Sequence, residues 1–394
     1  MKITRDAPLK NKCNKENTYM INKFANENKE MQLQIVRDLC KIPAPSFGER
    51  KRAEFCKAWL EHAGAKGVYL DEVNNVIFPI GCEDSNEITV VAAHIDTVFP
   101  DTEYYPEYRE DSENIYCPGA GDDTSGVSVV LMTAKYFIDN NIVPEKGIMF
   151  VCNVCEEGLG NLVGVRQLMK DFEGRVGRFI TYDGTLCTIT TVAAGSHRYE
   201  VEVKTKGGHS YQAFGNKNAI HALSEIINKI YSIDVPKKDG VRTTYNVGIV
   251  EGGTSVNTIA QSAKMLCEYR SNDRECLDTM RLEFEKIFKE AKTDEVDIIV
   301  KKIGDRPCKG DVDPVLEKEM VDVYTSAVKE FTGKDTLQRI ASTDANIPMS
   351  MGIPAVCMGA FSNFGSHTRE EYTHKAALTD GLKISIRTIT ELVK

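Results

Sequence analysis

Short apolar runs that alternate with helix-like segments constrain the fold of this chain most. Such runs lie at Ile88–Ala93, Gly147–Val154 and Arg178–Thr181, and a helical pattern over about Gly126–Asn140 separates the first two. Continuous apolar runs of this length are typical of strands that are buried on both faces. Strands that alternate with helices favour a parallel arrangement. We therefore expect an α/β fold with a mixed, mostly parallel sheet and helices on both faces.

The pattern changes after Gly195, where apolar and charged residues alternate over Tyr199–Lys204. Alternation is typical of a strand with one wet face. The following segments predict a helix over 219–231, strands over 244–250 and 263–269, a helix over 276–291 and a strand over 296–302. This βαββαβ order is that of a ferredoxin-like domain. We expect a discontinuous main domain, residues 1–195 and 303–394, with an inserted lid or dimerisation domain over 196–302.

The inserted domain also predicts an oligomeric state. The alternating strand and the helix over 219–231 would offer a sheet edge and an apolar face to a second copy of the chain. A two-fold dimer is the commonest way to bury such surfaces. We therefore expect a homodimer that forms through the inserted domain.

Charge and hydropathy exclude two classes of partner. The formal net charge is -9, whereas nucleic acids and anionic membranes bind clustered positive charge. The stretch Met1–Glu30 is polar and has no apolar signal-peptide core, and no long uncharged run follows it. We expect a cytoplasmic protein that binds neither nucleic acid nor membrane.

The chain has twelve cysteines. Several of them lie within apolar runs, where a free thiol packs as a small hydrophobic group. Cys152 and Cys155 have the spacing of a zinc or redox motif, but no second CxxC pair is present and residues i and i+3 of a strand face opposite ways. We interpret the cysteines as reduced core residues.

A histidine and an aspartate end the first buried run. His94 and Asp96 are two residues apart and share one face of the strand. His94 could bind a metal ion while Asp96 orients its ring, as metal-bound histidines usually require. A buried histidine–aspartate pair without metal is the alternative.

Two pairs of adjacent carboxylates follow along the chain. Asp122 and Asp123 stand in a glycine-rich turn before a helix, so either could cap the helix or face a positive group. Glu156 and Glu157 follow the run that ends at Val154, where nearby glycines can break the strand. One could then hold a metal and the other a proton, although a solvated acidic loop is equally compatible with the sequence.

Asp183 follows the strand that ends near Thr181, and His367 lies in a loop after an apolar segment near 353–358. These two residues, like His94, Glu156 and Glu157, therefore come directly after predicted strands or in the loops beyond them. Open α/β sheets place their sites at the carboxyl ends of strands. We expect one metal site at this edge.

The segments HIDTV, GAGDDTSG, CNVCEEGLG, ITYDG, GGHS, GGTSVNTIA, STDANIPMSMGIPAV and SHTREEY together resemble a family of two-zinc peptidases and deacylases. This family contains peptidase T, aminoacylase, succinyl-diaminopimelate desuccinylase and glutamate carboxypeptidase. The segments follow one another in the family's order from about residue 33 to the end of the chain. The resemblance implies a zinc-peptidase catalytic domain and hydrolysis of an amide bond in a small peptide or acylated amino acid.

The resemblance also implies a role for each site residue. Asp122 would bridge two Zn²⁺ ions, which Mn²⁺ or Co²⁺ could replace; His94 and Asp183 would complete one site, and Glu157 and His367 the other. Glu156 would be the general base and Asp96 the residue that orients His94. In the inserted domain, His209 and Asn257 would stabilise the oxyanion and Arg270 would hold a substrate carboxylate.

Several alternatives stay open. Thr124 stands where the family often has lysine, and His374 competes with His367, although only His367 has the family's spacing to a glutamate. GAGDD and CEEGLG look closer to the peptidase T branch, which favours a di- or tripeptide peptidase. An N-acyl amino acid deacylase would need the same metals. A catalytically inactive binding protein would have lost the base or the bridge, whereas Glu156 and Asp122 are both present.

Overall fold

The structure, a computed structural model, describes residues 7–394, with side chains from Glu16 onward. The chain forms two compact units. Unit 1 comprises the chain up to residue 191, residues 311–339 and residues 343–394; unit 2 comprises residues 192–310 and 340–342. The inserted domain expected over 196–302 falls within unit 2.

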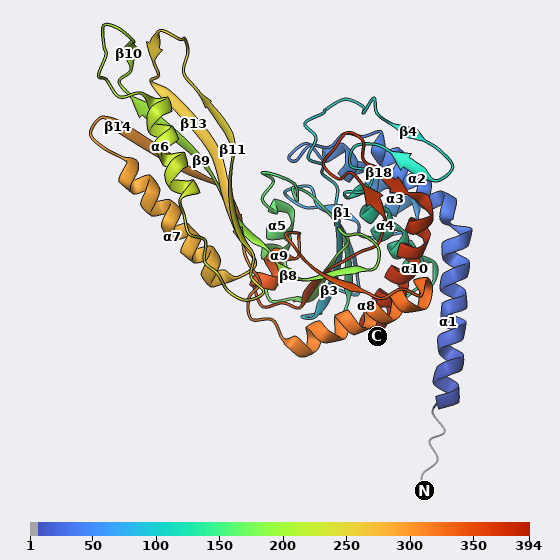
Figure 1. The fold of residues 1–394 in the computed structure, drawn as a ribbon. Coiled ribbons are helices and arrows are strands. Elements are labelled where there is room, and N and C mark those ends of the chain that lie inside the picture. The colour runs from blue at the N-terminus through green and yellow to red at the C-terminus, as the bar shows by residue number, and fades with distance from the viewer. Residues whose placement is uncertain (1–6) are drawn as a thin grey trace. The chain divides into compact units, whose positions relative to one another are not determined.

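Unit 1 is built around an eight-stranded sheet with the order β1-β2-β6-β3-β7-β16-β8-β15 (Figure 1). Its strands are β1 (Tyr69–Leu70), β2 (Val76–Ile80), β3 (Ile88–His94), β6 (Ile148–Asn153), β7 (Val176–Thr181), β8 (Thr188–Ala193), β15 (Leu337–Ala341) and β16 (Ala355–Met358). The last two residues of β8 and of β15 belong to unit 2. The four central strands β6, β3, β7 and β16 run parallel, whereas β2 and β8 pair antiparallel with their neighbours. The expected mixed α/β sheet is confirmed.

Every residue of β3 and of β6 is buried, which explains why their sequences show no wet face. Helices cover both sides of the sheet, with α4 and α10 on one side and α5 and α9 on the other (Figure 1). The helices of unit 1 are α1 (Ala7–Glu27), α2 (Lys29–Cys40), α3 (Arg50–His62), α4 (Thr124–Asp139), α5 (Val163–Asp171), α8 (Pro314–Thr332), α9 (Asn346–Ser350) and α10 (Lys375–Leu392). A small sheet of β4 (Arg109–Glu110), β5 (Asn114–Tyr116), β17 (Asn363–Phe364) and β18 (Tyr372–His374) completes the unit.

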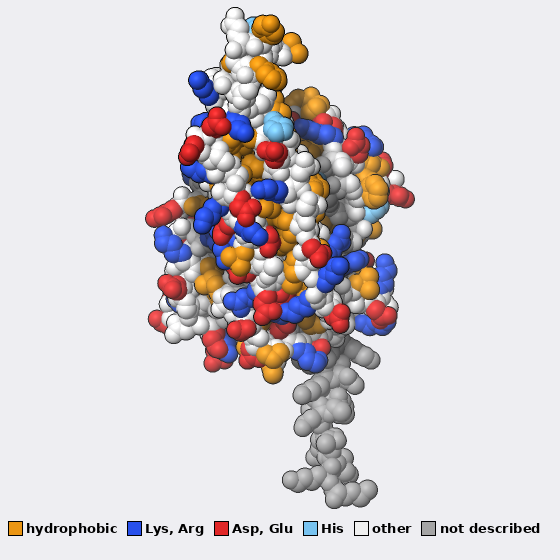
Figure 2. All heavy atoms as spheres, turned by 60° about the vertical axis from the view of Figure 1, so that its left-hand side comes forward, with side chains coloured by type: hydrophobic (Ala, Val, Ile, Leu, Met, Phe, Trp, Pro, Cys, Tyr) orange, Lys and Arg blue, Asp and Glu red, His pale blue; other side chains and the backbone are white. Residues whose placement is uncertain are grey.

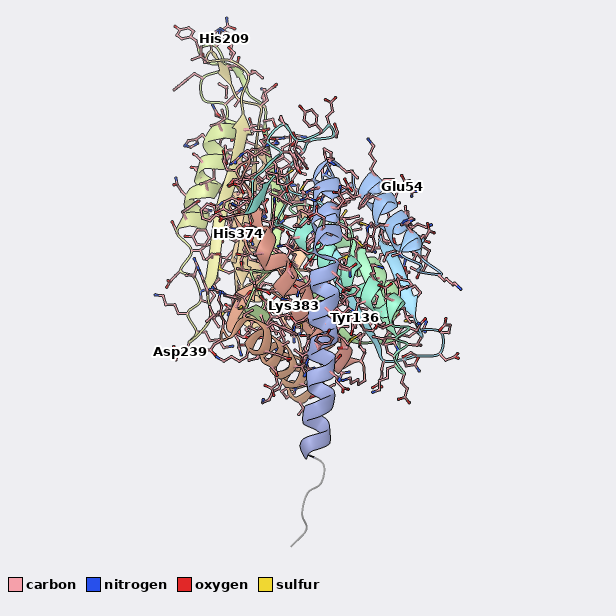
Figure 3. The ribbon with its side chains drawn as sticks, turned by 90° about the vertical axis from the view of Figure 1, so that its right-hand side faces the viewer. Glu54, Tyr136, His209, Asp239, His374 and Lys383 are labelled. Atoms are coloured by element: carbon pink, nitrogen blue, oxygen red, sulfur yellow. The ribbon has the colours of Figure 1, made fainter. Side chains whose placement is uncertain are left out.

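The N-terminal helix α1 has no counterpart among the helices expected from the sequence. The helix is polar in composition but has a narrow apolar stripe, in which Ile21 and Ala25 are fully buried. Phe24 packs edge-on against Tyr136 of α4, with ring centroids 5.1 Å apart. Figure 3 labels Tyr136 beside this helix. The stripe shows that α1 packs on unit 1 in spite of its polarity.

Unit 2 has the expected ferredoxin-like βαββαβ order. Its elements are β9 (Gly195–Thr205), β10 (Gly208–His209), α6 (Ala219–Tyr231), β11 (Thr243–Gly252), β12 (Thr258–Ile259), β13 (Ser262–Ser271), α7 (Arg274–Ala291) and β14 (Val296–Arg306). The main sheet has the order β11-β13-β9-β14 with every pair antiparallel. Side chains of both helices and of one sheet face form its core.

One expectation about unit 2 is wrong. The strand over Tyr199–Lys204 belongs to β9, which lies between β13 and β14 and offers no free edge. Most apolar residues of α6, among them Leu223 and Ile226, are buried in the core of the same unit. Sequence alternation reports that one face of a strand is wet but not whether the strand is central. The edges of the main sheet are β11 and β14.

The cysteines whose side chains the structure describes are all buried, and none forms a disulfide. Cys152 lies in β6, whereas Cys155 follows the end of that strand and accompanies Glu49, whose carboxylate oxygen lies 3.2 Å from its sulfur. The two residues therefore have separate surroundings.

Acidic and basic side chains are intermixed on the face of the molecule that Figure 2 shows. Among the helices of the described chain, none combines the length and the apolar character that crossing a membrane requires.

Candidate metal centre

The residues of the candidate site gather where the parallel strands of unit 1 end. His94 is the last residue of β3, Glu156 and Glu157 follow β6, Asp183 follows β7, and His367 lies in the loop between β17 and β18. Because β3 runs parallel to β6 and β7, the carboxyl ends of these strands meet at one edge. This is the edge where open α/β sheets place their sites.

Asp122 lies between two imidazole rings. One carboxylate oxygen of Asp122 is 3.2 Å from Nε2 of His94, and the other is 3.2 Å from Nε2 of His367. Nε2 of His367 also lies 3.3 Å from Oε1 of Glu157. The carboxylate thus has the position of a bridge between two sets of nitrogen and oxygen donors.

Three groups of side chains in this cluster could each hold a metal ion, and within each group the candidate ligand atoms lie within 4.8 Å of one another. The groups are His94, Asp122 and Asp183; Asp122, Glu157 and His367; and His94, Glu156 and Glu157. The first two are the ligand sets implied by the family resemblance and share Asp122. The third group places Glu156 beside His94 and Glu157. Both glutamates are therefore within reach of a metal ion, and these distances do not tell the ligand from the general base.

The charges and the hydrogen bonds of the cluster fit a cation. Nε2 of His94 is buried and forms no hydrogen bond of good geometry, and the carboxylate of Asp122 is 3.2 Å from it. Burial and the nearby Asp122 carboxylate raise the pKa values of Asp183 and Glu157. Asp122 and Glu157 hold the pKa of His367 at about 11. Crowded carboxylates around two imidazole rings match the N and O donors that zinc prefers.

Asp96 contacts both the ring of His94 and the loop that carries Glu156 and Glu157. Its carboxylate accepts hydrogen bonds from the backbone N–H groups of Glu156 and Glu157, each at 3.0 Å, and from the hydroxyl of Ser46 at 2.7 Å. One of its oxygens also lies 3.4 Å from Nδ1 of His94, whose closer contact is the Asp96 carbonyl oxygen at 3.1 Å. Asp96 can therefore set the orientation of His94 and the path of the chain through the two glutamates at the same time.

The neighbouring aspartates have different surroundings. Asp123 is the N-cap of α4, where its side chain accepts from the backbone N–H of Gly126, and it also accepts from that of His94. Gly126 permits this close approach because a Cβ there would come within 2.0 Å of the Asp123 carboxylate. Helix capping thus applies to Asp123, while Asp122 faces the two histidines.

Glu371 belongs to the site but was not singled out by the sequence analysis. This buried carboxylate accepts hydrogen bonds from three backbone N–H groups of the glycine-rich turn. They belong to Gly119 at 2.7 Å, Gly121 at 3.0 Å and Asp122 at 2.8 Å. Burial raises the pKa of Glu371 to about 7. The sequence shows that glutamates follow His367, but no local pattern predicts a contact with a turn some 250 residues earlier in the chain.

We expect Glu371→Gln to weaken metal binding by about 10- to 100-fold, the usual effect of removing a residue that orients a ligand. An amide cannot accept from all three N–H groups, so the turn that presents Asp122 would loosen. Competition with a chelating dye measures the affinity, and Glu370→Gln, at an exposed position, is the matched control. Wild-type affinity in Glu371→Gln would show that the turn holds Asp122 without this carboxylate.

The backbone of His367 has φ of 66°, in the left-handed region that residues other than glycine rarely adopt. Such strain is often found at functional sites. The rival His374 is in none of the three candidate groups. Its ring packs against Tyr372 with centroids 5.2 Å apart, and its backbone N–H donates to Ser362. The described contacts therefore place His367, and not His374, at the cluster.

The remaining expected residues belong to unit 2. His209 lies in β10, which pairs with β12, and the N–H of Ser210 donates to the carbonyl of Asn257 at 2.9 Å. His209 and Asn257 are therefore close neighbours, and Figure 3 shows His209 near one end of unit 2 and Asp239 near the other. Arg270 lies on β13, where its guanidinium group donates two hydrogen bonds to Glu268.

Known proteins resemble this chain over most of its length. Succinyl-diaminopimelate desuccinylase of Corynebacterium glutamicum is 25% identical over 353 residues, which cover 88% of this chain and 92% of the relative. The structure of aminopeptidase PepT from Bacillus cereus is similar, with a TM-score of 0.69 and 21% identity over 93% of this chain and 99% of that one.

A structure from Bacillus subtilis, described as a dinuclear metal-binding peptidase of the M20 family, has a TM-score of 0.62 and 16% identity over 94% of this chain and all of that one. At these identities the similar structures support the fold. The sequence model of peptidase family M20/M25/M40 matches residues 90–391, more than half of the chain. This chain therefore belongs to peptidase family M20/M25/M40, as its motifs indicated.

Proposed function

We propose that the protein is a metal-dependent peptidase that hydrolyses an amide bond in di- or tripeptides. The observation that carries the proposal is the pair of donor groups that share Asp122 at the carboxyl edge of the sheet. Family membership supports the reaction class. The resemblance to aminopeptidase PepT supports small peptides as substrates.

The residues present would hold two divalent ions. His94, Asp122 and Asp183 would bind one ion, and Asp122, Glu157 and His367 the other, with Asp122 as the bridge. A mixed set of imidazole and carboxylate donors suits Zn²⁺, and Mn²⁺ or Co²⁺ can occupy similar sites. When bound, the ions polarise the scissile carbonyl and acidify a water molecule.

Within this proposal Glu156 is the general base. It accepts a proton from the attacking water and delivers that proton to the leaving nitrogen, while Asp96 holds the backbone N–H of Glu156 in place. His209 and Asn257 donate to the oxyanion, and Arg270 binds a substrate carboxylate. Their proximity within unit 2 supports joint action of His209 and Asn257.

A deacylase acting on N-acyl amino acids is the second candidate, favoured by the similarity to a desuccinylase. Both reactions pass through the same tetrahedral intermediate. Turnover of a panel that includes di- and tripeptides, N-acetyl amino acids and N-succinyl amino acids separates them. We expect kcat/KM to be highest for a peptide with a free amino group. Turnover of acylated amino acids alone would overturn the assignment as a peptidase. If no substrate of the panel is cleaved, the assignment as an amide hydrolase is overturned.

We also propose that the chain forms a homodimer through unit 2, with β11 as the contact strand. This strand is an edge of the main sheet, and Ile249 and Val250 on it are about half exposed. Light scattering should give twice the chain mass of 43.9 kDa. The mass should fall towards that of one chain in Val250→Lys but not in Leu282→Lys, a control at an exposed position of α7. A monomeric wild type would refute the proposal.

A hybrid experiment tests whether His209 acts across that dimer. His209→Ala and Glu156→Gln chains, each nearly inactive alone, are mixed under conditions of subunit exchange. If His209 serves the partner's centre, one site of each hybrid carries both defects and the other carries neither, so activity returns. If activity does not return although subunit exchange is proven, His209 acts at the metal centre of its own chain or takes no part in the reaction.

A further inference from the structure

A tight turn before helix α3 carries an exposed aromatic side chain, that of Phe47. The turn comprises residues 45–48, and the backbone N–H of Gly48 closes it by donating to the carbonyl of Pro45 at 2.7 Å. Phe47 is 70% exposed. Exposure alone does not indicate a ligand, because single apolar side chains are common on protein surfaces. The backbone of this residue and its surroundings give the exposure a meaning.

The backbone of Phe47 is strained. Its φ is 69°, in the left-handed region that residues other than glycine rarely adopt. A positive φ at the third position of a four-residue turn favours glycine or asparagine. Phenylalanine strains the backbone there and does not bury its ring in return. Strain of this kind is often found where a protein contacts a ligand.

One carboxylate oxygen ties Phe47 to the chain that leads into Glu156. Oε1 of Glu49 accepts a hydrogen bond from the backbone N–H of Phe47 at 2.9 Å and another from that of Cys155 at 3.0 Å. Glu49 is only 4% exposed, so water has little access to these bonds. Because Cys155 directly precedes Glu156, the shared oxygen holds Phe47 beside the segment that carries the proposed base.

A second exposed apolar side chain, that of Leu159, lies beyond Glu156. Leu159 is 53% exposed and stands in a turn in which the N–H of Gly160 donates to the carbonyl of Glu157 at 2.7 Å. The same carbonyl oxygen of Glu157 is 3.2 Å from Oγ of Ser46. Ser46 adjoins Phe47 in the chain. Phe47 and Leu159 therefore each lie within two residues of one contact at the metal centre.

We propose that Phe47 and Leu159 bind an apolar side chain of the substrate, on a residue next to the scissile bond. A general base lies within hydrogen-bond reach of the water that attacks the carbonyl. The substrate residues that flank this carbonyl must therefore pass close to Glu156, where the two exposed side chains stand. An apolar side chain placed against them would lose its contact with water, which favours its binding. The inference rests on the proposed function, since it takes Glu156 as the base and a small peptide as the substrate.

The test compares leucine peptides with a glycine peptide on the metal-loaded, full-length chain. We expect kcat/KM for the better of Leu-Gly-Gly and Gly-Leu-Gly to exceed that for Gly-Gly-Gly. Phe47→Asn should lower this preference about tenfold, the usual effect of a lost apolar contact on specificity. Asparagine tolerates a positive φ, so the change removes the ring without adding strain. Phe47→Leu should keep most of the preference, and Leu159→Asn should lower it. Tyr19→Asn, at an exposed position of α1, is the matched control and should leave it unchanged.

The outcomes separate this inference from the proposed function. If all three peptides are cleaved and Phe47→Asn keeps the wild-type preference, the apolar contact is overturned and the peptidase assignment stands. If the wild type cleaves none of them and no other substrate of the panel, the proposed function fails. Calorimetric titration of the uncleaved peptides then decides the contact. Tighter binding of a leucine peptide that is lost in Phe47→Asn would support it, and equal binding of all three peptides would overturn it.

Discussion

Metal removal is expected to abolish hydrolysis of every substrate while the fold persists. The ligands stand on strands whose burial does not depend on metal, since β3 and β6 are entirely buried. Hydrogen bonds to Asp96 and Glu371 hold the surrounding loops from within the protein. Far-UV circular dichroism should therefore change little after chelation, and activity should return when zinc, manganese or cobalt is added.

The same prediction includes a pH dependence. In the metal-free protein Asp122 and Glu157 raise the pKa of His367 to about 11, so this ring is protonated at neutral pH. A metal ion can bind the ring only after that proton leaves, and metal affinity should therefore rise as pH rises. Chelator competition at two pH values, with metal content measured directly, provides the test. Full activity in protein shown to be free of metal would refute the metal mechanism.

The local sequence was sufficient to predict which strands are buried and where the polar residues follow them. Continuous apolar runs indicated central strands, and His94, Glu157 and Asp183 come directly after three of these runs. Parallel strands bring such positions together whatever the details of packing. The cluster at the sheet edge was predictable for this reason, although the role of each ligand remains a proposal.

Contacts between distant segments could not be predicted in the same way. Glu371 reaches the turn at Gly119–Asp122 only because the fold brings β18 beside β5. The position of β9 inside its sheet depends on pairing with β13 and β14, which no local pattern encodes. Helix α1 was missed because the burial of Ile21 and Ala25 is created by packing and not by a strongly apolar sequence.

Glu156→Gln is expected to lower kcat by about 10²–10⁴, the usual contribution of general-base catalysis. Glutamine preserves the shape of the side chain, and the backbone N–H of Glu156 can still donate to Asp96. Both metal ions and substrate binding should therefore be retained, so KM should change little compared with kcat. Inactivity through loss of metal would argue against the assignment of Glu156 as the base.

Glu157→Gln is the matched variant, because the two neighbours share one loop, are both buried and both donate from the backbone to Asp96. Either glutamate could bind metal in this structure. Glu157 lies 3.3 Å from His367 and belongs to a donor group with Asp122, but Glu156 and Glu157 also form a group with His94. We expect Glu157→Gln to lose one ion per chain, measured by elemental analysis after dialysis. If Glu157→Gln keeps both ions while Glu156→Gln loses one, the two glutamates exchange roles: Glu156 binds metal and Glu157 carries the proton.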